Sequence, residues 1–182
     1  MRMGQEMADR KGQAADSTKK VALMPGNVRA GQVISLVEVT GGLGSKITAS
    51  RLADELGADI AVLIPILDAA ELLGLVKAEK GEVTLTEFGQ KFQRTTRQKV
   101  RLLTDQLRQI EPFKTAVDLV NRRGSASAEE VAANLTERGL EWYHEQELNI
   151  DLLRTILIHW AIYAGLLTYN KDGRFEPVKP VK

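Results

Sequence analysis

Hydrophobic and polar positions along the chain predict the same order of elements twice. In the first half, the apolar positions of residues 47–56 fall on one face of a short helix. Residues 59–76 are apolar almost all round, which is typical of a buried helix. Alternating apolar positions in residues 76–85, interrupted by a turn at Lys80-Gly81, then predict a β-hairpin. The first half therefore has the order helix, turn, helix, hairpin.

The second half repeats this order with a longer interruption. Residues 127–135 correspond to the short helix, and residues 160–167 correspond to the end of the apolar helix. A hairpin that turns at Asp172-Gly173 follows, while residues 138–149 have no counterpart in the first half. Helix, turn, helix and hairpin used twice predicts two winged-helix units in tandem, in a mainly α protein of the α+β class.

A longer helix is predicted between the two units. Within residues 96–111, apolar side chains recur at spacings of three and four and form a narrow seam of Val100, Leu103, Leu107 and Ile110. Because each unit is small, we expect this seam to be buried against both. The predicted organisation is a disordered tail at 1–20, a first winged-helix unit at 21–95, linking and packing helices at 96–124, and a second winged-helix unit at 125–182.

Several element ends can also be predicted. Thr48 and Thr86 are expected to cap the helices that follow them, because a threonine hydroxyl can accept a free N–H of the first turn. Residues 33–39 fit one face of a helix but could also form a strand. Gly41-Gly42 ends that element in either case.

Composition narrows the function classes. The 182 residues carry a formal net charge of +1, which gives no global attraction to nucleic acid or anionic lipid. The absence of cysteine excludes disulfides, thiolate nucleophiles and cysteine-ligated zinc. No apolar run approaches the roughly 18–20 residues of a membrane-spanning helix, and the N-terminus lacks the apolar core of a signal peptide. We therefore expect a cytoplasmic protein that does not insert into a membrane.

No motif predicts catalysis. The glycine-rich residues 41–48 suggest a phosphate-binding loop, but such a loop needs glycine directly before its lysine and Ser or Thr directly after it. Here Ser45 precedes Lys46 and Ile47 follows it, so a turn is the better interpretation. His144 lacks the second histidine, four positions later, that a zinc-binding helix requires. We expect no enzymatic activity, no cofactor and no metal.

A winged helix often binds DNA by placing the second helix of its turn in the major groove. In the first unit this helix offers Asp59, Asp68 and Glu71, which would repel phosphate, in place of residues that read base edges. In the second unit Arg154 is a weak candidate for a base contact. The most basic surface belongs to the linking region, where a solvated helix face is an equally good explanation, and consists of Arg94, Arg97, Lys99, Arg101 and Arg108.

The inserted stretch carries two neighbouring aromatic residues, Trp142 and Tyr143. Aromatic side chains of this kind often anchor protein–protein contacts, so the pair is a candidate binding site for a partner. Packing under the second wing is an equally good explanation.

Four segments resemble the AAA-associated C-terminal domain family. They are Met24-Pro25-Gly26-Asn27-Val28-Arg29-Ala30-Gly31-Gln32-Val33, Leu52-Ala53-Asp54-Glu55-Leu56, Leu67-Asp68-Ala69-Ala70-Glu71-Leu72-Leu73-Gly74 and Leu85-Thr86-Glu87-Phe88-Gly89-Gln90-Lys91-Phe92. The resemblance covers residues 24–176, and its first segment is the least common of the four. The family is found behind the ATPase subunit of nitrate/sulfonate/bicarbonate-type ABC transporters. The resemblance therefore implies an accessory role beside a nucleotide-binding domain, without catalytic residues.

Two hypotheses remain at this point. In the first, the chain is a non-catalytic regulatory module that binds protein, either an ABC-type ATPase subunit or a second copy of itself. In the second, it is a winged-helix transcriptional regulator that binds DNA. The fold alone does not choose between them, but the acidic and apolar character of the first presumptive recognition helix favours the first hypothesis.

Overall fold

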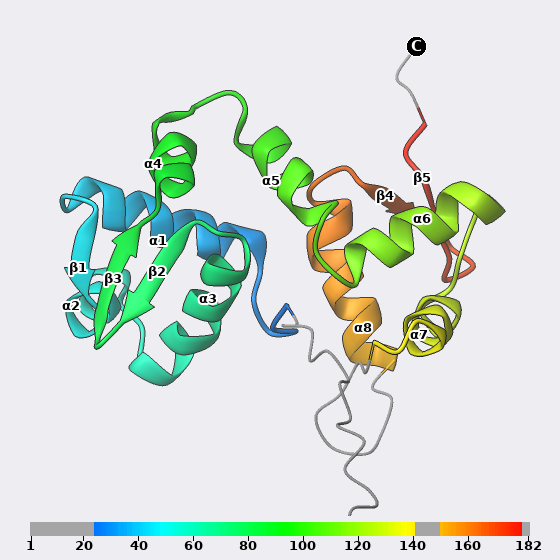
Figure 1. Ribbon diagram of the computed structural model, residues 1–182, viewed down its shortest axis with the longest axis horizontal. Coiled ribbons are helices and arrows are strands. Elements are labelled where there is room, and N and C mark those ends of the chain that lie inside the picture. The colour runs from blue at the N-terminus through cyan, green and yellow to red at the C-terminus, as the bar shows by residue number, and fades with distance from the viewer. Residues whose placement is uncertain (1–23, 141–149, 180–182) are drawn as a thin grey trace, which may run out of the picture.

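The computed structural model describes residues 24–140 and 150–179. Within these residues the protein is mainly helical and has two small antiparallel sheets, as predicted for an α+β chain. Figure 1 shows the first sheet and its helices on one side of the molecule, and the second hairpin with α6, α7 and α8 on the other. Helix α5 lies between them.

The N-terminal half contains a three-stranded sheet and four helices. The strands pair in the order β1–β3–β2, with Lys46 opposite Thr84 and Val76 opposite Leu85. The hairpin predicted at residues 76–85 is confirmed, whereas β1 was not predicted because its three residues contain a single buried apolar side chain. The elements are α1 (Ala30–Gly42), β1 (Lys46–Thr48), α2 (Ala49–Leu56), α3 (Ile60–Leu72), β2 (Val76–Glu79), β3 (Glu82–Leu85) and α4 (Glu87–Arg94).

The caps predicted at Thr48 and Thr86 are present, whereas Asp59 precedes α3 without a side-chain cap hydrogen bond. The Thr48 hydroxyl accepts the N–H of Arg51 at 3.3 Å, and the Thr86 hydroxyl accepts the N–H of Gly89 at 2.9 Å. Each bond satisfies one of the free donors at the start of a helix. The sequence was compatible with either a helix or a strand at residues 33–39, and in the structure these residues lie in α1. Their apolar side chains face the core at helical spacing.

The C-terminal half contains a two-stranded hairpin and four helical segments. The predicted turn at Asp172-Gly173 is confirmed, with Leu167 paired to Pro177 and Tyr169 to Phe175. The last helix continues from α8 directly into a wider π-helical segment. The elements are α6 (Phe113–Arg123), α7 (Ala128–Glu137), α8 (Ile150–Ile156), the π-helical segment Leu157–Ile162, β4 (Leu167–Tyr169) and β5 (Phe175–Pro177).

The linking helix is shorter than predicted. Helix α5 spans Lys99–Leu107, and of the predicted seam Leu103 and Leu107 are buried while Ile110 packs partly buried against the core. The prediction for Val100 was wrong, because its side chain is 47% exposed. Lys99 makes the contact to the N-terminal half instead, through an ion pair with Glu38 of α1.

One hydrophobic core runs through both halves. The segment before α1 joins them, because the indole N–H of Trp160 donates to the backbone carbonyl of Val28 at 3.0 Å in a buried position. A Cβ added at Gly26 would lie 1.8 Å from the Leu152 side chain, so this backbone approaches α8 closely. Helix α5 is also attached to the C-terminal half, because the Thr104 hydroxyl donates to the Ala164 carbonyl at 2.6 Å.

Some predictions fall outside this description. The tail at 1–20 and the histidine at position 144 lie outside the described residues. The boundaries of the two units, and their assignment as winged helices, stay predictions. Among residues 24–140 and 150–179, no helix combines the length and the apolar character needed to cross a membrane.

Candidate interaction surface

Four of the predicted basic residues are exposed along the segment from the end of α4 to the end of α5. Arg94 ends α4, Arg97 lies between the helices, and Arg101 and Arg108 are at or just beyond α5. All four side chains are exposed, and none has an ion pair with another described residue. Lys99 differs, because its ammonium group pairs with Glu38 and lies 6.0 Å from the centre of the Phe92 ring. Lys99 therefore has a described acidic partner, whereas the four arginines do not.

Arg154 lies on α8 and is occupied by acidic neighbours. Its guanidinium donates to Glu129 at 2.8 Å and also pairs with Asp151. The pKa of Glu129 is lowered, first by its own backbone N–H and the Ser127 hydroxyl and then by Arg154. A base contact by Arg154 would have to break both ion pairs, so this side chain is poorly placed to read DNA. The spacing of Asp151 and Arg154 indicates one pair, but the contact with Glu129 depends on tertiary structure.

Helix α3 exposes three large apolar side chains. Ile60, Val62 and Ile64 are 47%, 49% and 52% exposed. Their helix is apolar almost all round, as the sequence analysis found, and it packs on the core through its other side only. The signal lay in the unbroken apolar run of residues 60–67, since a helix that packs on one side cannot bury eight consecutive positions.

Acidic side chains surround this apolar surface. Asp59 precedes α3, and Asp68 and Glu71 follow on its exposed side. A small depression of about 310 Å³ lies next to it, between α2 and α3, and is lined in part by Asp54 and Asp59. Glu71 has a structural role, because its carboxylate accepts the N–H of Ala78 at 2.6 Å. This part of the surface combines exposed apolar area with negative charge.

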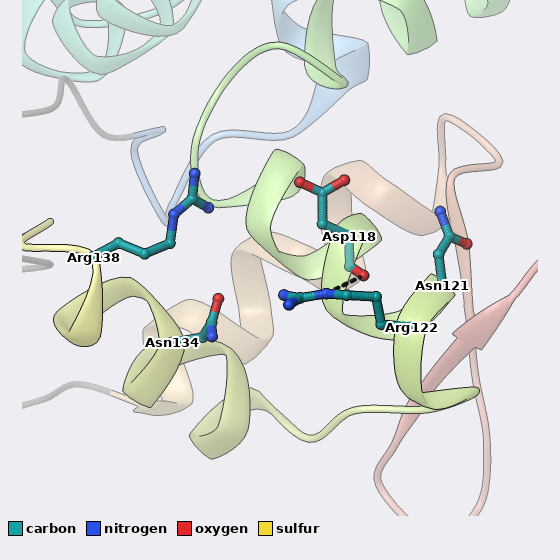
Figure 2. A pocket seen from close by; sticks show the side chains of 5 residues that line it. All are labelled: Asp118, Asn121, Arg122, Asn134 and Arg138. Carbon is teal, nitrogen blue, oxygen red and sulfur yellow. Dashed lines mark hydrogen bonds between the residues drawn. The ribbon is translucent and has the colours of Figure 1, made fainter.

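A larger depression lies between α6 and α7 in the C-terminal half. It measures about 530 Å³ and is lined by Asp118, Asn121, Arg122, Asn134 and Arg138. Figure 2 shows the Arg122 guanidinium extending from α6 toward Asn134 on α7. Because both signs of charge line the depression, it has no clear preference for an anion or a cation. It also lacks the large apolar side chains that line most ligand pockets.

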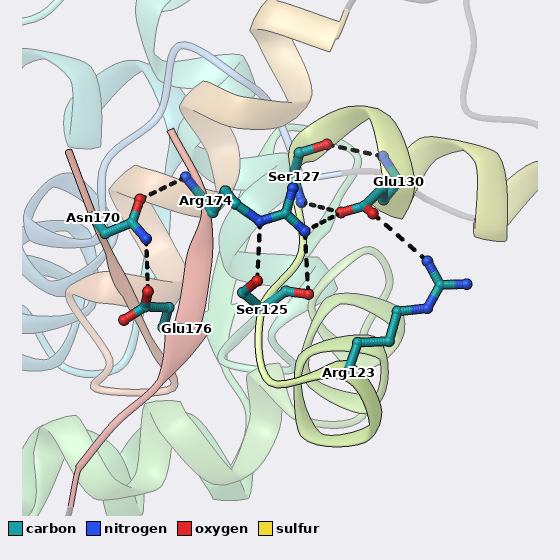
Figure 3. A network of polar contacts seen from close by, with 7 residues as sticks. All are labelled: Arg123, Ser125, Ser127, Glu130, Asn170, Arg174 and Glu176. Carbon is teal, nitrogen blue, oxygen red and sulfur yellow. Dashed lines mark hydrogen bonds and ion pairs between the residues drawn. The ribbon is translucent and has the colours of Figure 1, made fainter. Parts of the chain in front are cut away.

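A polar network joins the second hairpin to the start of α7 (Figure 3). Arg174 donates to the Ser125 hydroxyl at 2.9 Å and to the Glu130 carboxylate at 2.7 Å. Glu130 and Ser127 form a reciprocal capping box, with Glu130 accepting the Ser127 N–H at 2.7 Å and Ser127 accepting the Glu130 N–H at 3.3 Å. Arg123 approaches the same carboxylate at 3.7 Å. This network explains the polar residues here by a structural role.

The charge of Glu130 should make this region sensitive to acid. The Ser127 N–H, aided by Arg174, lowers the pKa of Glu130 below its ordinary value near 4.5. A lowered folded-state pKa stabilises the protein above the ordinary value, and this stabilisation is lost as the pH falls through the folded-state pKa. Because the side chain is 35% exposed, Glu130→Gln should cost less than about 1 kcal/mol at neutral pH.

Urea unfolding of the Glu130→Gln variant at neutral pH and at about pH 3 would measure this effect. The variant should lose less stability than the parent on acidification. Glu137→Gln, at the end of the same helix, is the matched control and should follow the parent. A parent and a Glu130→Gln variant with the same pH dependence would contradict the assignment.

Among the residues that the structure describes, no three His, Asp or Glu side chains are grouped to hold a metal ion. His159 lies half-buried in the π-helical segment, and its buried Nδ1 has no hydrogen-bond partner there. Trp142 and Tyr143, the predicted partner-binding pair, lie outside the described residues.

Comparison with known proteins gives one finding. No curated protein and no solved structure matches the chain. Residues 50–170 match the family described as the C-terminal AAA-associated domain. This range runs from α2 through the π-helical segment to the end of β4. It therefore includes the exposed apolar residues of α3 and the exposed arginines between α4 and the end of α5. Because the match covers more than half of the sequence, the chain belongs to the C-terminal AAA-associated domain family.

Proposed function

We propose that this chain is a non-catalytic accessory module that binds and regulates an ABC-type ATPase subunit of the nitrate/sulfonate/bicarbonate class at the cytoplasmic side of the membrane. Its family, which is associated with AAA ATPases, supports this role. We also propose that both halves are winged helices, since each contains a helix followed directly by an antiparallel hairpin. In this proposal the winged helices bind protein and do not read DNA.

The observation that carries the proposal is the surface of α3. In a DNA-binding winged helix, the equivalent helix enters the major groove and presents polar or basic side chains to the bases. Here it presents Ile60 and Ile64 beside Asp68. Apolar side chains gain nothing from a phosphate-lined groove, and carboxylates are repelled by it. Exposed apolar patches of this kind are typical of protein-binding surfaces.

One observation favours the alternative function. Arg94, Arg97, Arg101 and Arg108 are exposed without ion pairs in the described part of the chain, so they could contact the phosphates of a DNA backbone. Such contacts do not depend on base sequence. If they are the basis of DNA binding, the affinity should be weak, with a Kd of about 1–100 μM, and should fall steeply with salt.

The two functions can be separated with three measurements on the purified chain. The ATP hydrolysis rate of the nitrate/sulfonate/bicarbonate-type ATPase subunit from the same organism should change when the chain is added. Calorimetry should show no ATP binding by the chain alone, because the residues around Lys46 do not form a phosphate loop. Selection from a random DNA pool should enrich no sequence.

One result would establish the DNA-binding function instead. It is nanomolar binding to a defined duplex at physiological salt, lost on Arg154→Ala, in a variant whose circular dichroism is unchanged. The proposal would also be contradicted if the ATPase subunit did not bind the chain and if its ATP hydrolysis rate were the same with and without the chain.

A further inference from the structure

Two exposed surfaces of this chain have complementary chemistry. The first, which we call the α3 face, consists of Asp54, Asp59, Ile60, Ile64 and Asp68. The second, which we call the arginine face, consists of Arg94, Arg97, Val100, Arg101 and Arg108. Each combines exposed apolar area with charge of one sign, and the two signs are opposite.

Three residues of the α3 face form a row along one side of the helix. Ile60, Ile64 and Asp68 are four residues apart, so they follow one another along the same side of α3. Asp54 and Asp59 lie beside the N-terminal end of this row, where they line the depression between α2 and α3. None of the three aspartates has an ion pair with another described residue, so their charge is available to a partner.

The arginine face has the opposite charge in a similar arrangement. Its four guanidinium groups are exposed and have no ion pair in the described residues. Val100 lies among them and is 47% exposed. Elsewhere, Arg138, Arg154 and Arg174 each pair with a carboxylate. Of the six described arginines without an ion pair, four lie in residues 94–108, and the other two are Arg29 and Arg122.

The two faces lie in different parts of the molecule. In Figure 1, α3 lies below α1, whereas α4 and the segment leading to α5 lie above it. The arginine face of one molecule can therefore meet the α3 face of another.

We propose that the chain associates with itself head to tail, with the α3 face of one copy docked on the arginine face of the next. Ile60 and Ile64 lose water against the apolar surface around Val100. The aspartates gain the guanidinium partners that they lack within one molecule. Such a contact joins two different surfaces. An assembly of any length therefore keeps a free α3 face at one end and a free arginine face at the other. This inference does not depend on the ATPase partner, since it needs only the chain itself.

Charge reversal on either face tests the proposal. Sedimentation velocity of the parent chain at low ionic strength should show association that grows with protein concentration and weakens at high salt. Asp54→Lys/Asp68→Lys places like charges opposite the arginines of the next copy, and Arg97→Glu/Arg101→Glu does the same to the aspartates. Each double variant should weaken the association constant by about tenfold or more.

A mixture of the two double variants gives the decisive result. The arginine face of the first variant faces the unchanged aspartates of the second, and its new lysines face the new glutamates. Equimolar mixing should therefore restore the association that neither variant has alone. Lys114→Glu/Lys171→Glu changes the net charge as much as Arg97→Glu/Arg101→Glu, but at exposed positions in the C-terminal half. This control should associate like the parent.

Three outcomes would overturn the proposal. They are a parent chain that stays monomeric at every concentration at low salt, a mixture of the two variants that stays monomeric, and an arginine-face variant that associates as strongly as the parent. The last result would indicate a symmetric contact between two α3 faces. The effect of the parent chain on the ATP hydrolysis rate of the ATPase subunit is a separate measurement, so failure here and failure of the proposed function are distinguishable.

Discussion

Replacing Leu107 by aspartate is expected to lower the free energy of unfolding by about 3–5 kcal/mol. The Leu107 side chain is fully buried at the end of α5 and belongs to the core that runs through both halves. Aspartate would remove this apolar contact and place a carboxylate where the described structure offers apolar neighbours. Urea unfolding followed by circular dichroism would measure the change in free energy.

Val100→Asp is the matched control, because it introduces the same carboxylate on the same helix. Val100 is exposed and lies in the first turn of α5, where a negative charge interacts favourably with the helix dipole. Its substitution should change stability by less than about 0.5 kcal/mol. Equal costs at the two positions would show that α5 is not anchored through Leu107.

Replacing Gly89 by alanine is expected to destabilise the protein by about 2–4 kcal/mol, against the usual preference of helices for alanine. A Cβ at Gly89 would lie 1.9 Å from the backbone oxygen of Leu75, which cannot move aside as a side chain could. That oxygen also accepts the N–H of Thr86 at 3.1 Å, so the start of α4 is fixed to the turn before β2. The midpoint of thermal unfolding should fall accordingly.

Gly31→Ala tests whether the Gly89 effect is steric. Gly31 lies in the first turn of α1, and a Cβ there would meet no atom within 4 Å. Alanine at this position should therefore stabilise the protein by up to about 1 kcal/mol, since it restricts the unfolded chain. If both substitutions destabilised the protein, or if neither did, the close approach of α4 to Leu75 would be contradicted.

The family resemblance acquires a physical explanation at two of its segments. In Leu85-Thr86-Glu87-Phe88-Gly89, threonine caps α4 and glycine permits its close contact with the preceding turn. In the segment that begins at Met24, the Val28 carbonyl accepts the Trp160 indole across the joint between the halves. The cap by Thr86 could be predicted from the preference of helix N-termini for threonine. The hydrogen bond between Val28 and Trp160 joins residues far apart in the chain, so no local sequence pattern indicates it.

Local physical chemistry was enough to predict most of the elements. Both hairpins, the caps at Thr48 and Thr86, and the helix periodicity of the long segments depend on interactions between residues close in sequence. For the same reason the acidic character of α3 was visible from the sequence, because Asp59 and Asp68 are part of its composition. The family of the chain was also recognisable at this level.

Only the tertiary structure decided which apolar and charged side chains remain exposed. A run such as residues 60–67 has the same hydrophobicity whether one side or all sides of its helix are covered, so the exposure of Ile64 depends on what packs around α3. Val100 is exposed although Leu103 and Leu107 of the same apolar seam are buried. Arg154 pairs with Glu129, which is distant in the sequence, whereas Arg101 has no ion pair among the described residues. Burial and ion pairing are properties of the packed molecule, and the sequence by itself determines only which residues could take part.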